Sequence, residues 1–356
     1  NHIFSKHSKN TKNLIQQLAT EFPLDKLREI VDQFSSLKVL VIGDIIFDKY
    51  STVAVQGLTS KNRILSSRFV DESLQPGGAL AIFRHIREFT PQVKLLSLVG
   101  KETWVEKFLD DYLSFEENWV FQESSFTTII KHRFVEPLSD GKELSKLFSV
   151  NHLNEDYPEK VIINKLSEKL KREITNFDLV LVADFGHGVM SDDIRNIVQE
   201  KAPFLSLNCQ TNSNNYGFNV INRQYQRADS FSLDQTEMSL ACGKKKFNEI
   251  QELESLFYSF GASYGWFTRG GSETIGIGTD AKPYLLDSLE NSVIDTVGAG
   301  DAFCAVVSLA AAQGLPVELA TLFGQVSGAL AVRIVGNSNC VSKSSFFKAL
   351  EALIKY

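Results

Sequence analysis

The stretch DTVGAGDAFCA, from Asp295 to Ala305, decides how this 356-residue sequence is interpreted. A short apolar segment precedes it, and a run of small apolar residues typical of a buried helix follows it. Gly298, Ala299 and Gly300 leave consecutive backbone N–H groups uncovered, and the start of a helix adds a partial positive charge. The turn is therefore suited to holding an anion, which Asp301 would repel unless this acid has another role.

Two interpretations of Asp301 follow from these residues alone. In the first, its carboxylate accepts the proton of an attacking hydroxyl while the amides stabilise a phosphoryl group, which is phosphoryl transfer to an alcohol. In the second, it is an ordinary capping aspartate after a glycine turn. Local features leave both open.

The composition narrows the classes of function. The hydrophobic content is 43%, enough for a sizeable core. The formal net charge of −6 argues against a nucleic-acid partner, and the one dense basic run, Lys244 to Lys246, is interpreted as a solvated segment. No apolar run approaches the roughly 20 residues of a membrane span, and residues 1–20 lack a signal-peptide pattern. We therefore expect no membrane association and a cytoplasmic location.

The four cysteines and six histidines predict neither a zinc site nor a disulfide framework. The cysteines never form a CxxC pair, and no histidine stands at metal-ligand spacing from them. A reducing compartment fits this usage. The sequence does not begin with Met, as expected of a fragment of a longer protein.

Short apolar runs alternate with helical patterns along most of the chain. We expect residues 1–36 to be an N-terminal appendage or linker, and residues 37–356 to be one domain with a mostly parallel sheet between two layers of helices. Two segments, 63–71 and 127–135, are expected to form a small β lid. The other expected strands are 38–43, 93–99, 178–183, 204–207 and 264–268, and the expected helices are 79–89, 159–174, 301–313, 316–333 and 344–355.

Polar or glycine-rich clusters follow several of these strands. In open parallel sheets, ligands bind beyond the carboxyl ends of the strands. We therefore expect these clusters to meet at one site; they are residues 43–44, 184–188, 208–215, 268–271 and 295–301.

With these observations in hand, the stretch at 295–301 resembles the second signature of the PfkB (ribokinase-like) family of carbohydrate kinases, DTxGAGD, with every fixed position present. The chain has no GxxxxGK, so a P-loop kinase is not supported. The resemblance extends from about Leu37 to the C-terminus. It implies a ribokinase-like three-layer α/β/α fold, ATP and Mg²⁺ as cofactors with a monovalent cation as a further one, and a homodimer formed through the lid.

Four further motifs carry this resemblance, and each has a plainer alternative. Asp48 closes KVLVIGDIIFD and would bind sugar hydroxyls, or cap a turn. Gly77 and Gly78, in a PGG signature, would let the substrate approach the backbone, or open the helix that follows; both can hold. Asp234 and Glu237, where the family has NxxE, would order magnesium, or form a helix capping box. Thr268 and Gly270, from a TxGxxG-like loop, would line the nucleotide pocket together with Asp295, or mark a β-hairpin turn.

Within the family, GDIIFD and the loop DFGHG at 184–188 are similar to segments of heptose-7-phosphate kinases, with His187 where a lysine is usual. His187 would contact the substrate, or be a loop histidine bonded to backbone. The sequence also resembles PfkB-like domains joined to nucleotidylyltransferases, which carry stretches similar to DFGHG and to NCQTNSNNYGFN at 208–219. This likeness implies such a domain at the N-terminus and a role in surface-polysaccharide or nucleotide-sugar synthesis.

Three departures support an alternative. Ala81, Gln210 and Glu273 stand where the family has a sugar-contacting asparagine, a lysine and a glycine. Without cations at 187 and 210, the sequence supports a phosphorylated substrate less strongly than a neutral sugar. The alternative is a catalytically silent binding or scaffolding domain of a larger enzyme. The intact DTVGAGD favours an ATP-dependent sugar or sugar-phosphate kinase with Asp301 as general base.

Overall fold

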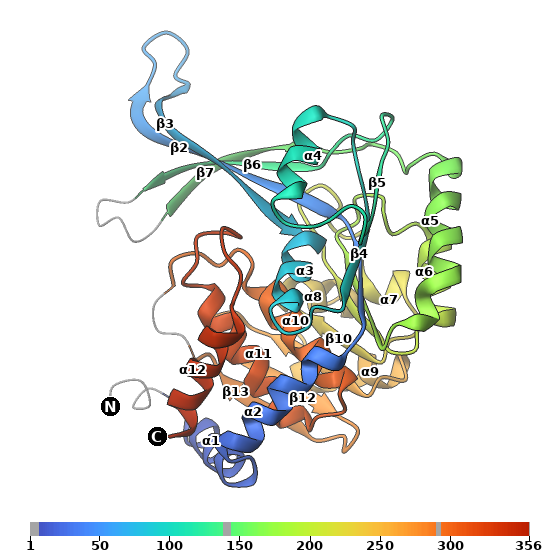
Figure 1. Ribbon diagram of the computed structural model, residues 1–356. Coiled ribbons are helices and arrows are strands. Elements are labelled where there is room, and N and C mark those ends of the chain that lie inside the picture. The colour runs from blue at the N-terminus through green and yellow to red at the C-terminus, as the bar shows by residue number, and fades with distance from the viewer. Residues whose placement is uncertain (1–6, 138–143, 290–292, 356) are drawn as a thin grey trace.

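A large sheet forms the centre of the computed structural model, which describes residues 7–137, 144–289 and 293–355 (Figure 1). The strand order is β13-β12-β11-β10-β9-β8-β1-β4-β5. The strands from β11 to β5 run parallel, β12 pairs antiparallel with β11, and the edge strand β13 pairs antiparallel with β12. Their bounds are β1 Val39–Gly43, β4 Val93–Val99, β5 Trp119–Gln122, β8 Leu179–Asp184, β9 Leu205–Cys209, β10 Ser230–Leu233, β11 Tyr264–Thr268, β12 Glu273–Gly278 and β13 Pro283–Asp287.

Helices cover both faces of this sheet, as expected from the alternating pattern (Figure 1). The helices α3 (Ala79–Arg87), α10 (Ala299–Ala312) and α11 (Val317–Ala331) pack on one face, while α5 (Lys160–Glu173) and α6 (Asp192–Lys201) lie together on the other side. The predicted α/β/α class is confirmed. The remaining helices are α1 Lys9–Glu21, α2 Leu24–Gln33, α4 Thr103–Asp110, α7 Ile221–Gln224, α8 Gln235–Cys242, α9 Glu249–Ser259 and α12 Lys343–Ile354.

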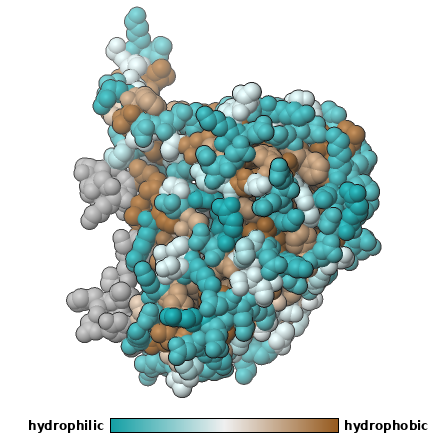
Figure 2. All heavy atoms as spheres, in the orientation of Figure 1, coloured by the Kyte–Doolittle hydropathy of each residue, from teal (hydrophilic) through white to brown (hydrophobic). Residues whose placement is uncertain are grey.

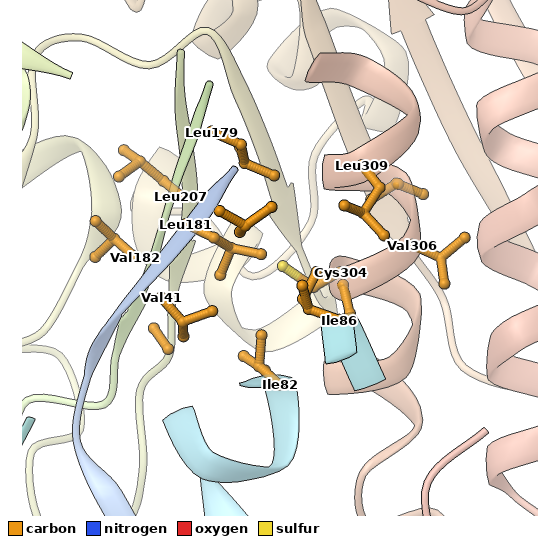
Figure 3. Packing of buried hydrophobic residues seen from close by; sticks show 14 of the residues in the cluster. Val41, Ile82, Ile86, Leu179, Leu181, Val182, Leu207, Cys304, Val306 and Leu309 are labelled. Carbon is orange, nitrogen blue, oxygen red and sulfur yellow. The ribbon is translucent and has the colours of Figure 1, made fainter. Parts of the chain in front are cut away.

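The core explains why the strands are continuous apolar runs. Every residue of β8 is buried, as a strand covered on both faces requires. Figure 3 shows Leu181 and Val41 of the sheet on the same side of α10 as Cys304 of that helix, with Ile82 of α3 next to Val41. Because α10 carries small residues and is buried along nearly its whole length, it can lie close to the sheet and to α11. This packing fixes the start of α10, where Asp301 lies.

A second sheet projects from the body and is larger than the sequence predicts (Figure 1). Its order is β3-β2-β6-β7, from β2 (Ile45–Leu58), β3 (Leu65–Gly78), β6 (Ile130–Pro137) and β7 (Leu144–His152). The predicted segments 63–71 and 127–135 are parts of β3 and β6. The pairing of β2 with β3 leaves one extra residue on each strand, Gln56 on β2 and Val70 on β3, which interrupts the regular alternation by which a strand is recognised.

The residues before the predicted domain start also pack on the body. Ile15, Leu18 and Phe34 are fully or almost fully buried, and the Phe34 ring packs edge-on against Phe89 and Phe323 at centroid distances of 6.1 and 6.3 Å. The mild amphipathic pattern at 24–34 fits a short helix or a linker, and the segment forms α2, whereas the sequence pattern did not predict α1. The domain boundary at residue 36 stays a prediction.

In the part of the chain that the structure describes, every helix is too short or too polar to cross a lipid bilayer.

Candidate active site

A cavity of about 290 Å³ lies between the lid sheet and the carboxyl ends of the parallel strands. It brings together most of the clusters that the sequence singles out, although they are far apart along the chain. Its walls come from the lid, from the loops after β9 and β10, and from the start of α10. The lining residues used below are Asp48, Gly78, Lys131, Arg133, Phe185, Asn208, Gln210, Asp234, Glu237, Thr268, Gly298, Gly300, Asp301 and Asn337.

Asp301 lies in the first turn of α10, with its side chain buried at the floor of the cavity. Burial raises the pKa of its carboxyl to about 7, and the charge of Asp48 adds to this effect. A hydrogen bond from Gln210 Nε2, at 3.3 Å, acts in the opposite direction. A carboxyl that titrates near neutrality can take up a proton from an attacking hydroxyl.

The turn before Asp301 presents backbone amides at the start of α10, of which the N–H of Ala299 makes a long turn hydrogen bond of 3.5 Å to the carbonyl of Thr296. Gly298 is the N-cap of α10 with φ +84°, and no side chain among the described residues caps this helix end. The first N–H groups of a helix have no partner within the helix, so they are open to an anion from the cavity. A Cβ on Gly298 would collide with Oδ1 of Asn337, which leaves glycine as the fitting residue.

Asp295, at the start of the same stretch, is a buried support for the turn. Its Oδ1 accepts the N–H of Val297 at 3.2 Å, and its Oδ2 accepts the N–H of Gly336 at 3.0 Å. Lys146 of the lid lies 3.3 Å from Oδ1. Asp295 is outside the cavity lining, so it can act on a cofactor only through the turn that it holds.

The opposite wall of the cavity is built around Asp48. Its carboxylate is paired with Arg133 of β6 and accepts a hydrogen bond from Asn337 Nδ2 at 3.1 Å. Gly77 lies so close to Asp48 that a Cβ would collide with this carboxylate, so this glycine makes room for Asp48. Gly78, with φ +59°, lines the cavity and immediately precedes α3. Both suggested roles of the glycine pair therefore have a counterpart in the fold.

The comparisons with known proteins agree with this geometry. The profile described as pfkB family carbohydrate kinase matches residues 130–344. This chain belongs to that family. The match includes the whole of the stretch at 295–301 and the loops after β8, β9 and β10.

The curated relatives of this pfkB-family chain include two bacterial proteins named bifunctional protein HldE. The one from Hydrogenovibrio crunogenus is 23% identical over 91% of this chain and 65% of its own length, and the one from Koribacter versatilis is 26% identical over 88% and 63%. The chain thus spans less than two thirds of these relatives.

Solved structures share the fold. Escherichia coli phosphofructokinase-2, in complex with substrates and products, has a TM-score of 0.68 at 13% identity, covering 89% of this chain and 99% of that one. Arabidopsis thaliana ribokinase, complexed with ribose and ATP, has a TM-score of 0.66 at 17% identity, covering 88% and 99%.

Lys131, Arg133 and Asn337 line the cavity of this pfkB-family chain, and the sequence did not single them out. Lys131 and Arg133 are two positions apart on β6, so the period of a strand puts both on the cavity face. Arg133 is paired with Asp48, whereas Lys131 has no ion pair with any described residue. Burial lowers the pKa of Lys131, while the charges of Asp48 and Asp301 oppose this. The sequence does offer one signal for these two residues: the predicted strand 127–135 carries two cations, Lys131 and Arg133, on the same face.

The loop at 184–188 contributes Phe185 to the cavity lining and is held in place by Asp44. Asp44 accepts hydrogen bonds from the N–H groups of Phe185, His187 and Val189 at 3.1, 3.2 and 3.0 Å. Burial raises the pKa of Asp44 to about 6, and the charge of Asp184 adds to it. His187 is buried outside the cavity lining, and burial lowers its pKa to about 3.

The two carboxylates predicted to hold magnesium form the capping box that was the alternative. Asp234 Oδ1 accepts the N–H of Glu237 and Glu237 Oε2 accepts the N–H of Asp234, both at 2.8 Å. Burial raises the pKa of Glu237. Both acids also line the cavity, and each has a second oxygen that bonds to no described residue. Magnesium prefers carboxylate oxygens and keeps several waters, so this pair fits it, although nowhere in residues 7–137, 144–289 and 293–355 do three such groups cluster.

Of the two loop residues predicted to line a nucleotide pocket, one lines the cavity and the other does not. Thr268 lines the cavity at the end of β11, and its hydroxyl donates to the carbonyl of Leu233 at 3.3 Å. Gly270, with φ +55°, lies in the turn between β11 and β12, outside the lining. This turn joins two antiparallel strands, as the hairpin alternative predicted. Glu273 begins β12 and pairs with Arg269 at 2.7 Å.

Proposed function

We propose that this chain transfers the γ-phosphoryl group of ATP to a hydroxyl of a sugar or sugar phosphate. The observation that carries the proposal is the position of Asp301. Its carboxyl, with a pKa raised to about 7 by burial, faces the cavity in the same helical turn as the uncapped amides of α10. A base for the acceptor hydroxyl and donors for the phosphoryl group are then adjacent, which phosphoryl transfer requires.

Each wall of the cavity has a role in this scheme. Asp301 takes the proton, and the amides at Gly298, Ala299 and Gly300 bind the transferring group. Asp48 orients acceptor hydroxyls, with Gly77 and Gly78 allowing close approach. Bound magnesium, held by Glu237 and Asp234, would neutralise charge on the phosphates. Thr268 and Gly270 lie next to the nucleotide. The lid excludes water, so that ATP is not hydrolysed.

The acceptor is a sugar or sugar phosphate of the heptose type. Two observations support this class: the HldE relatives, and the lining cation Lys131, which has no ion pair among the described residues and can meet a phosphate. A nucleotidylyltransferase domain joined to this chain, and a role in nucleotide-sugar synthesis, fit relatives that are bifunctional and longer.

A monovalent cation as a further cofactor is supported by phosphofructokinase-2 of Escherichia coli, solved in complex with potassium. The cytoplasmic location stays a prediction.

The test is ADP release from ATP and magnesium with a panel of heptoses, hexoses, pentoses and their phosphates. Wild-type chain and Asp301→Asn are compared. Sugar-dependent release that falls about 10²–10⁴-fold in the variant supports the proposal, since this is the usual effect of removing a positioned base. If no acceptor gives turnover while ATP still binds in calorimetry, the silent-domain alternative is correct.

The lid also carries an apolar face that suits a second copy of the chain. His132 and Phe134 alternate with the cavity-facing cations of β6, so they lie on the outer face. The rings of Phe134 and Phe148 stack at 4.5 Å, and the side chains of Phe148 and Val150 remain 54% and 47% exposed. Figure 2 shows further apolar residues on the projecting hairpin and below it. A homodimer through the lid would cover this face; phosphofructokinase-2 is known as a tetramer in its inhibited form.

A further inference from the structure

The ion pair between Lys146 and Asp295 joins the edge of the lid to the turn that binds the phosphoryl group. Lys146 lies on β7, an edge strand of the lid, and Asp295 begins the stretch that ends at Asp301. Nζ of Lys146 is 3.3 Å from Oδ1 of Asp295. The side chain of Asp295 is 3% exposed and that of Lys146 is 45% exposed. The pair therefore links the lid sheet to the turn at the start of α10.

A β-bulge directs Lys146 towards this partner. Phe134 pairs with Phe148, but the next residue of β6, Val135, pairs with Lys146, so Leu147 is the extra residue. With regular alternation, Lys146 would share the outer face with Phe148 and Val150. The bulge shifts it to the cavity side, and re-aiming a side chain is a recurrent use of bulges.

Asp295 is also hydrogen-bonded to the segments that form two walls of the cavity. Its Oδ1 also holds the N–H of Val297 in the anion-binding turn, and its Oδ2 holds the N–H of Gly336. The next residue, Asn337, bonds to Asp48 and leaves room only for glycine at 298. Its own N–H donates to Gln75 of the lid at 2.7 Å. Displacement of Asp295 would therefore disturb the amides and the Asp48 wall together.

We propose that Lys146 is a positioning residue that couples closure of the lid to assembly of the anion-binding turn, an inference that rests on the proposed kinase function. With the lid closed, Lys146 balances the buried carboxylate and holds Val297 and Gly298 in place. With the lid open, Lys146 returns to water, while Asp295 keeps an uncompensated charge in a buried position. The turn is then stable in its phosphoryl-binding form only when the lid excludes water.

The kinetic test compares Lys146→Met, Lys146→Arg and a control, Lys49→Met. Lys49 forms an ion pair within the lid, with Glu72 at 2.9 Å, and has no ion pair or hydrogen bond with the described residues of the turn. We expect Lys146→Met to lower kcat about tenfold or more with KM for ATP within about twofold, because ground-state binding is retained. Lys146→Arg should restore most of kcat, and Lys49→Met should match the wild type. A wild-type kcat in Lys146→Met would overturn the proposal.

Amide hydrogen exchange supplies a readout that does not depend on turnover. In Lys146→Met, peptides covering both 144–152 and 293–301 should exchange faster than in the wild type, whereas Lys49→Met should leave 293–301 unchanged. Unchanged exchange at 293–301 in Lys146→Met contradicts the coupling. If the wild-type chain shows no turnover on any acceptor, the kinase proposal fails, and exchange still decides whether Lys146 holds the turn.

Discussion

The side-chain amide of Gln210 lies 3.3 Å from Oδ1 of Asp301, and its same Nε2 lies 2.9 Å from Oδ1 of Asn208. Gln210 stands where the family resemblance leads one to expect a lysine. A neutral amide stabilises the Asp301 carboxylate less than an ammonium group would, and burial then keeps the pKa of this carboxyl near 7. In the proposed kinase, the glutamine would therefore adjust the pKa of the base and leave the carboxylate in place.

Substitution of Gln210 should move the pH profile of the kinase. We expect Gln210→Lys to lower the pKa of Asp301, so that the acidic limb of kcat/KM shifts by about one pH unit to lower pH. Gln210→Leu, which removes the hydrogen bond, should shift the limb to higher pH. The measurement is kcat/KM for the acceptor between about pH 5 and 9. Three superimposable profiles would show that Asp301 does not control the limb.

The same carboxyl should destabilise the folded chain at high pH. The folded-state pKa of Asp301 is raised to about 7 from an ordinary value of 3.8, so the folded state binds more protons between these values. The free energy of unfolding therefore falls as pH rises from about 4 to about 7. Asp301→Asn, a neutral isostere, should be more stable than the wild type at about pH 8, by on the order of 2–4 kcal/mol, since one pKa unit is about 1.4 kcal/mol. Thermal unfolding at about pH 8 and about pH 4 measures this, and an equal difference at both would contradict it.

The fold follows from the sequence where the signal is local. The strands β4 and β11 match the predicted residues at both ends, because a short apolar run bounded by turns is typical of a buried strand. The strands of the lid are harder to predict, because their cavity face is polar and their outer face is apolar and exposed. Strand β7 begins next to residues outside the described part of the chain, and its bulge interrupts the alternation of inward and outward side chains.

The site follows from the sequence only where a motif marks it. The stretch at 295–301 identifies Asp301 and its amides, and Asp48 closes a recognisable motif, although it lies within β2 and not at the end of the first strand. Asn337 has no such mark, since it meets Asp48 across 289 positions of the chain. Lys131 is an ordinary lysine in a β-rich segment until the lid is assembled over the cavity. Contacts between distant elements, which no local pattern encodes, supply these members of the site.

A charge placed on the outer face of the lid should separate the copies of a dimer. Phe148→Glu puts a carboxylate on the exposed, stacked ring position opposite Phe134. If this face is the interface, the wild type should be dimeric and the variant monomeric at micromolar concentration, because an unpaired charge in an apolar interface is costly. Light scattering measures the mass. Val161→Glu, at an exposed apolar position of α5, is the matched control. Equal masses for all three chains would assign the face another role.

The cation on the cavity wall should distinguish the acceptor classes. A hydrogen bond from Lys131 to a phosphate is worth about 1.5–3 kcal/mol, so Lys131→Met should lower kcat/KM about 10- to 100-fold for sugar phosphates. Neutral sugars should lose much less, and Lys131→Arg should retain most activity. The comparison uses matched pairs of a sugar and its phosphate. An equal loss for both members of a pair would assign Lys131 to the phosphates of ATP.

Two glycines of one turn offer a test of the anion-binding amides. At Gly298 the backbone has φ +84° and a Cβ would collide with Asn337, whereas a Cβ on Gly300 meets no atom within 4 Å. Gly298→Ala should therefore unfold at a temperature several degrees lower than the wild type, consistent with roughly 1–3 kcal/mol of backbone strain. Gly300→Ala, at a helical position where alanine is favoured, should unfold at the wild-type temperature or above. Thermal unfolding of both variants without nucleotide makes this comparison. If Gly298→Ala is as stable as Gly300→Ala, the turn is not held as described, and the amides of α10 are not fixed before ATP binds.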